Sequence, residues 1–149
     1  IIGMPLILEN ASYYGQSHND LSESEFINAV LDESGCDLLL DVNNIYVNSI
    51  NHRYDALELL EALPLEPARY SHISWHYDEA EDLKVDTHGA DVIGPVWQLL
   101  AQAYERVGPL PTLLERDFNF PPLPELLREV GQVKTCQSVC EPRFATGVA

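Results

Sequence analysis

The amino-acid sequence predicts an α/β fold built around a parallel sheet, on three observations. Short apolar segments alternate with longer segments of helical periodicity along most of the 149 residues. The connections between them are short, as expected when helices cover a parallel sheet. Polar side chains gather directly after the predicted strands, which is where α/β proteins place their sites.

The first predicted elements are a strand, a helix and a second strand. Residues 4–8 form an apolar run ending in Glu9. Ser22 and Glu25 have the spacing of a helix-capping box, and Gly35 is well placed to end that helix. The continuous apolar segment 36–42 is typical of a parallel strand covered on both faces.

The second half continues the alternation. Asp55 is the expected N-cap of a helix that Pro64 stops, and Pro95 is favourable in the first turn of a later helix. A short acidic link is expected between two of the strands. The remaining predicted elements are strands at 69–75, 83–86 and 111–114, a helix from Pro95 to Gly108, and a helix at 123–130.

These elements amount to about five strands, whereas a (β/α)8 barrel has eight units and about 250 residues. The chain is therefore either a small open sheet or about the last five strand–helix units of a TIM barrel. It begins abruptly in a strand and lacks an initiator Met, which favours a barrel whose first three units are missing. We expect residues 1–133 to form the C-terminal portion of that domain, and 134–149 to form a poorly patterned, frayed tail.

Composition excludes several classes of function. With 24 acidic and 8 basic residues the formal charge is −16, which argues against binding DNA, RNA or anionic lipid. No apolar run has the length of a membrane span. The three cysteines are too few for a disulfide scaffold, and their odd number leaves one unpaired, so a cytoplasmic location is expected.

Candidate metal ligands cluster between His72 and Gly89. Neutral imidazoles and carboxylates in such a group suit a transition metal better than a phosphate. The other predicted strand ends contribute similar side chains. Over the whole chain the candidates are Glu9, Asp41 with Asn43 or Asn44, His72, His76, Asp86, His88, and Glu115 with Asp117.

The spacing of these residues leaves alternatives open. Asp86 and His88 share a strand face with Cα atoms roughly 6–7 Å apart, although a surface Asp beside a capping His would look the same. His72 and His76 are roughly 13 Å apart along a strand, so they reach one ion only if the chain bends. Two ions in one pocket are the easier interpretation.

Other candidates also have simple structural explanations. Asp41 shares strand parity with Asn43, and Asn44 matches only if the strand has turned into a loop; asparagines there are commonly turn residues. Glu9 could belong to a loop, and Glu115 could form an exposed ion pair with Arg116. His18 and His52 are expected in solvent, and Cys136 with Cys140 is a weak signal. The convergence of five equivalent strand ends favours a metal site.

Four sequence segments carry a family resemblance. Leu-Leu-Leu-Asp-Val-Asn-Asn-Ile-Tyr-Val-Asn, His-Ile-Ser-Trp-His, Asp-Thr-His-Gly-Ala and Pro-Thr-Leu-Leu-Glu-Arg-Asp resemble the multinuclear non-haem iron-dependent oxidases, which include the methanobactin-biosynthesis oxidase. The resemblance covers roughly residues 5–130. It implies a xylose-isomerase-like TIM barrel with two or three iron ions. Family members modify cysteine in ribosomally made peptides with O2, usually with a peptide-binding partner protein.

The resemblance also implies a ligand set. In this chain it would consist of Glu9, Asp41, Asn44, His72, His76, Asp86, His88 and Glu115, with Asp117 orienting a ligand. The chain departs from the family pattern at the bulky Ser74-Trp75 pair and at Arg116, where an aromatic residue is common.

Two rival functions remain at this point. A zinc or manganese isomerase or phosphodiesterase could use the same ligand types on the same barrel. Alternatively, the site could stabilise a non-catalytic metal-binding module.

Overall fold

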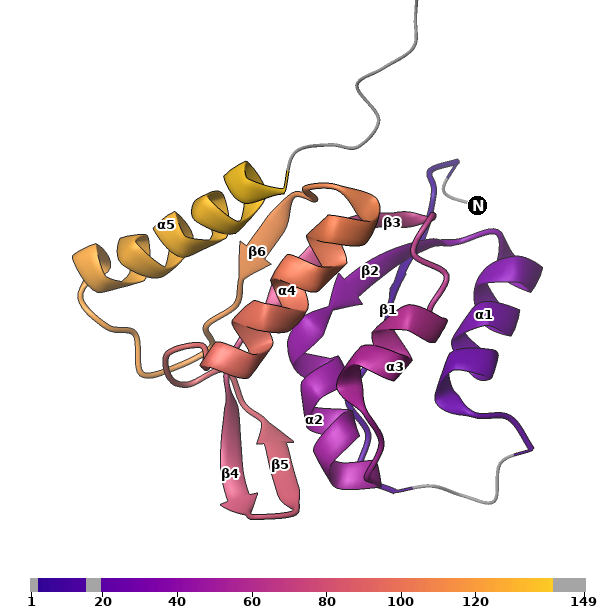
Figure 1. The fold of residues 1–149 in the computed structure, drawn as a ribbon, viewed down its shortest axis with the longest axis horizontal. Helices are drawn as coiled ribbons and strands as arrows, with labels where there is room; N and C mark the ends of the chain where they lie inside the picture. Colours follow the sequence, from indigo (N-terminus) through magenta and orange to yellow (C-terminus); the bar gives the residue numbers. More distant parts are fainter. Residues whose placement is uncertain (1–2, 16–19, 141–149) are drawn as a thin grey trace, which may run out of the picture.

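The computed structural model describes residues 3–15 and 20–140, which form a sheet with helices packed against it (Figure 1). The elements in chain order are β1 (Ile7–Glu9), α1 (Glu23–Ser34), β2 (Asp37–Asp41), α2 (Val42–His52), α3 (Ala56–Ala62), β3 (Ala68–Ile73), β4 (His76–Ala80), β5 (Leu83–Asp86), α4 (Gly94–Val107), β6 (Thr112–Leu114) and α5 (Leu123–Val139).

The main sheet has four parallel strands in the order β1-β2-β3-β6, which confirms the predicted α/β class. In Figure 1 helices α3 and α4 cross in front of these strands. The core lies between the two layers, where Leu40 of β2, Ile73 of β3, Leu60 of α3 and Leu100 of α4 are fully buried. Within the described residues the sheet is open, so closure into a barrel stays a prediction.

The register of the sheet places functional candidates side by side. Asp41, the last residue of β2, is the register partner of His72 in β3. His72 is in turn the partner of Leu113 in β6. Partners in a parallel ladder point to the same face, so the carboxyl ends of β2 and β3 present their polar side chains together.

Several predicted helix boundaries are confirmed. Ser22 and Glu25 form the capping box of α1, and Gly35 ends that helix in the left-handed region at φ 67°. Asp55 caps α3 by accepting hydrogen bonds from the amides of Leu57 and Glu58. In each case a local backbone requirement selects the residue type, which makes the boundary readable from sequence.

Helix α2 was missed, because its asparagines were interpreted as turn residues. Asp41 caps it by accepting a hydrogen bond from the Asn44 amide at 2.8 Å. Val42, Ile45 and Val47 are completely buried and hold the helix in place. Tertiary burial here outweighs the low helix propensity of asparagine.

The interpretation of residues 83–86 as one of five strands of the parallel sheet was wrong. The predicted acidic link is largely strand β4, and it pairs with β5 in an antiparallel hairpin separate from the main sheet. The hairpin projects beyond the sheet in Figure 1. Asn51 of α2 anchors it, because its side chain accepts from the Lys84 amide and donates to the Lys84 carbonyl.

The last helix is longer than predicted. Helix α5 continues to Val139, whereas the sequence pattern placed its end at Val130 and a frayed tail from 134. Val133 packs into the core and Gln137 donates a hydrogen bond to the Leu110 carbonyl, so contacts outside the helix extend it. In the part of the chain that the structure describes, every helix is too short or too polar to cross a bilayer.

Candidate metal centre

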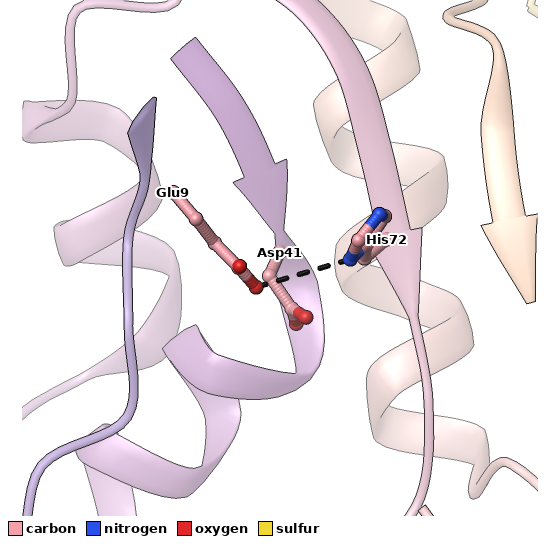
Figure 2. A group of neighbouring side chains, drawn as sticks. All are labelled: Glu9, Asp41 and His72. Carbon is pink, nitrogen blue, oxygen red and sulfur yellow. Dashed lines mark ion pairs between the residues drawn. The ribbon is translucent and has the colours of Figure 1, made fainter. Parts of the chain in front are cut away.

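One group of possible ligands comes from three neighbouring strands. Glu9, Asp41 and His72 stand at or near the carboxyl ends of β1, β2 and β3, and each offers a ligand atom within 4.8 Å of the others. Figure 2 shows the three side chains converging, with His72 Nδ1 3.8 Å from Glu9 Oε1. We call Glu9, Asp41 and His72 the strand group.

Asp41 is the most constrained member of the strand group. Its side chain is fully buried, and burial raises the pKa of the carboxyl to about 8. The Asn44 amide lowers this pKa, whereas the nearby carboxylates of Glu9, Asp86 and Glu115 raise it further. Because an ionised carboxylate is costly to bury without a compensating charge, this position favours a bound cation.

A second group comes from the connections that follow β5 and β6. His88, Glu115 and Asp117 also offer ligand atoms within 4.8 Å of one another. His88 Nδ1 lies 3.1 Å from Asp117 Oδ2 and 3.7 Å from Glu115 Oε2. We call His88, Glu115 and Asp117 the loop group.

The loop group is strongly polarised around its histidine. Asp86 Oδ1 lies 2.6 Å from His88 Nε2, and this carboxylate is the main cause that raises the pKa of His88 to about 9. Glu115 and Asp117 raise the pKa further, while partial burial lowers it. Without a metal ion an imidazolium is thus favoured among these carboxylates; a metal ion would supply the same positive charge.

Glu115 joins the two groups. Its Oε2 lies 3.4 Å from His72 Nδ1 in the strand group and 3.7 Å from His88 Nδ1 in the loop group. A carboxylate in this position can bridge two cations, one on each side.

The other predicted ligands are connected to this cluster through asparagines. Asn43 donates a hydrogen bond to Asp86 Oδ1 and its amide oxygen faces Nδ1 of His76, both at 2.8 Å. His76 and Asp86 are cross-strand partners in the hairpin. Asn44 Nδ2 lies 3.3 Å from Glu9 Oε1. All eight predicted ligands therefore belong to one continuous network.

His76 differs from the other two histidines of the network. It is 1% exposed, and burial lowers its pKa, so a neutral ring is favoured. Strand β3 ends at Ile73 and β4 begins at His76, so His72 and His76 stand on different strands. His76 belongs to neither the strand group nor the loop group.

The residues present fit a metal ion. Four buried polar atoms of the network lack a hydrogen-bond partner among the described residues, although a buried polar atom normally has one. They are Asp41 Oδ2, Asn44 Oδ1, His72 Nδ1 and His88 Nε2; the two ring nitrogens lie near carboxylates, but without the geometry of a hydrogen bond. Oxygen and imidazole donors of this kind bind iron, manganese and zinc alike.

Sequence reasoning missed Asn10, which supports the strand group. This residue is 1% exposed and makes two 2.9 Å hydrogen bonds with the backbone of Asp41, one to the carbonyl and one from the amide. An asparagine directly after a strand and beside a candidate ligand was the available signal.

Two further expectations need correction. Arg116 is not in an exposed pair with Glu115; its buried guanidinium contacts Glu129 at 2.8 Å. His52 is not a solvent residue, because its ring stacks on Tyr13 with centroids 3.9 Å apart. His18 lies outside the described residues, and the three cysteines are free.

Sequence comparison places this cluster in a known context. Over residues 1–138 the chain matches the family described as RiPP precursor modification enzyme MbnB/TglH/ChrH. Among curated proteins it is 60% identical over 137 residues to a UPF0276 protein of Shewanella sediminis, covering 92% of this chain and 49% of the relative. It is 55% identical over 139 residues to a UPF0276 protein of Nitrosospira multiformis, covering 93% of this chain and 49% of the relative.

The chain thus spans about half the length of the curated relatives it matches. The family match includes every strand and every candidate ligand described above. The chain belongs to the MbnB/TglH/ChrH family of enzymes that modify RiPP precursors, the ribosomally made peptides that are altered after translation.

Proposed function

We propose that this chain is part of a multinuclear iron-dependent oxidase that modifies cysteine residues of a ribosomally made peptide with O2. The observation that carries the proposal is the position of Glu115, whose carboxylate approaches His72 on one side and His88 on the other. Such a bridge is what two neighbouring ions require. Family membership supports the peptide substrate.

In this proposal the strand group and the loop group hold separate ions, two or three in total. Asp86, Asn44 and His76 would complete the ligand set. Iron would supply the electron exchange with O2 and the substrate thiol, which side chains alone do not provide. The protein supplies geometry, charge balance and the orientation of each ligand.

The surrounding side chains have defined tasks in such a centre. Asn10 and the Asn44 amide fix the position of Asp41. Asn43 holds Asp86 by donating a hydrogen bond to its carboxylate. Asp117 and Glu115 both face Nδ1 of His88, so the three side chains of the loop group point to one position, while Asp86 faces Nε2 of the same ring. Bound cations would neutralise the negative charge of the carboxylates, and this charge balance favours metal binding.

The rest of the active protein is also part of the proposal. The four parallel strands would belong to a TIM barrel, whose sites lie at the carboxyl ends of the strands, where this cluster stands. A peptide-binding partner protein would present the substrate, as the family resemblance implies. Nucleic acid and membrane are not proposed partners, because the chain carries a charge of −16.

The test is metal content together with oxygen uptake. Intact protein is purified without oxygen, its metals are quantified by inductively coupled plasma mass spectrometry, and O2 consumption is followed after adding a cysteine-bearing precursor peptide. Two or more irons per chain, with peptide-dependent O2 uptake, are expected. Zinc or manganese without O2 uptake would instead support the isomerase or phosphodiesterase, and bound metal without any turnover would support a non-catalytic module.

A further inference from the structure

A buried ion pair involves Arg116, which lies between two members of the loop group in sequence. The guanidinium of Arg116 contacts Glu129 Oε2 at 2.8 Å, and each of the two side chains is 4% exposed. The same guanidinium contacts the more exposed Asp91 at 3.2 Å. Arg116 stands between Glu115 and Asp117 in sequence, and neither of these neighbours is its partner. It therefore anchors the segment that carries two members of the loop group.

Glu129 ties a second segment to the same point. Its other carboxylate oxygen, Oε1, accepts a hydrogen bond from the amide of Val92 at 2.9 Å. Val92 belongs to the connection between β5 and α4, which carries His88. One carboxylate on α5 thus fixes the connection after β5 and the connection after β6 relative to each other.

The geometry of the loop group depends on how these two connections meet. The Asp117 amide donates to the His88 carbonyl at 3.1 Å, and the side chains of the same two residues are also 3.1 Å apart. His88 has φ 52°, in the left-handed region that non-glycine residues rarely adopt. A backbone in that conformation persists only where its surroundings determine it.

Stability alone is a weak explanation for the pair. Burying two charges costs desolvation, and a well-packed apolar pair of similar volume is often at least as stable. A guanidinium adds a defined orientation, because its planar set of N–H donors binds carboxylates in a fixed geometry. The pair therefore suits a positioning task better than a purely structural one.

We propose that the Arg116–Glu129 pair positions the loop group, so that His88, Glu115 and Asp117 keep the arrangement in which they bind an ion. This inference rests on the proposed function in one respect, the presence of that ion. Arg116 and Glu129 are positioning residues and not ligands.

The first test is Fe2+ binding by intact protein under anaerobic conditions, measured by competition with a chromogenic chelator. In the R116M/E129L variant we expect the affinity at the loop group to fall about 10- to 100-fold, the usual effect of removing support behind a ligand. Affinity at the strand group should stay close to wild type. The midpoint of thermal unfolding should fall only modestly, because E129L also removes the hydrogen-bond acceptor of the Val92 amide. The matched control is R53Q/D82N, which removes an ion pair of 79% and 66% exposed side chains and should change nothing.

A second variant and a metal-free readout keep the test decisive. R116K retains the positive charge but not the planar guanidinium, so it should fold and still weaken binding of the same ion. In metal-free protein the imidazole NMR signals of His88 should shift in both variants, while those of His52 stay in place. Unchanged His88 signals and unchanged Fe2+ affinity would overturn the inference, as would a loss of thermal stability without either change. If wild-type protein binds no Fe2+, the proposed function fails, but the His88 signals still decide the positioning role.

Discussion

The strand group and the loop group use the same residue types but are built in different ways. Asp41 and His72 are register partners in a parallel ladder, so backbone hydrogen bonds set their separation. His88, Glu115 and Asp117 stand on connections after β5 and β6, outside the strand ladders. Single backbone hydrogen bonds, such as the one from the Asp117 amide to the His88 carbonyl, and side-chain contacts hold them. Half of the centre therefore comes from the sheet itself, and the other half depends on contacts between the loops and α5.

The largest expected effect concerns Glu115, because it contacts both groups. Glu115→Ala should reduce iron from two or more ions per chain to less than about one, since both ions lose a ligand that no neighbouring residue replaces. Metal content of anaerobically purified protein is the measurement. Glu125→Ala, at an exposed position in the first turn of α5, is the control. Full iron content in Glu115→Ala would remove the basis for a bridge.

The next comparison separates the two groups. His72→Ala should remove the ion of the strand group and His88→Ala that of the loop group, each leaving about one ion bound. Iron content measured as a function of added Fe2+ gives both numbers. If either substitution releases all the iron, the strand group and the loop group form a single site and not two.

The two groups should also differ in how pH changes the stability of metal-free protein. The pKa of Asp41 is raised from 3.8 to about 8, so the folded state binds more protons, and its contribution falls as pH rises between these values. The pKa of His88 is raised from 6.5 to about 9, so its stabilisation is complete below 6.5 and is lost by about 9.

Denaturant unfolding at several pH values tests both windows. Asp41→Asn keeps a residue that can cap α2, and it should flatten the decline below pH 8 and raise stability at that pH. His88→Gln should flatten the decline between pH 6.5 and 9, with a smaller effect because solvent partly screens this site. An unchanged pH profile in Asp41→Asn would show that burial of this carboxylate costs little.

The smallest effect is expected at Gly89. A Cβ at this position would overlap the ring of Phe118, but that ring is 45% exposed and can swing outward. Gly89→Ala should therefore lower the free energy of unfolding by about 1 kcal/mol and weaken ion binding only at the loop group. Denaturant unfolding and Fe2+ titration check this. The G89A/F118A double variant should recover the affinity; if it does not, the overlap is not the cause.

The same contrast explains how much the sequence could predict. The capping box at Ser22, the caps at Gly35 and Asp55, and the helix opened at Pro95 all follow from local backbone chemistry. The strand group follows from polar residues at strand ends. In both cases the information lies within a few residues of the feature.

What could not be predicted depends on contacts distant in sequence. Helix α2 forms because Val42 and Ile45 are buried and Asp41 caps it, although its asparagines are typical of turns. Residues 83–86 pair with β4 and not with the sheet, since Asn51 anchors their backbone. The burial of Arg116 depends on Glu129, which lies on another element.

The main sheet also has a consequence for handling the protein. Among the described residues, β1 and β6 each pair with a strand on one side only. Edge strands generally present unpaired amide and carbonyl groups, which are templates for pairing with another chain. The 149-residue chain is accordingly expected to associate with itself in a concentration-dependent way.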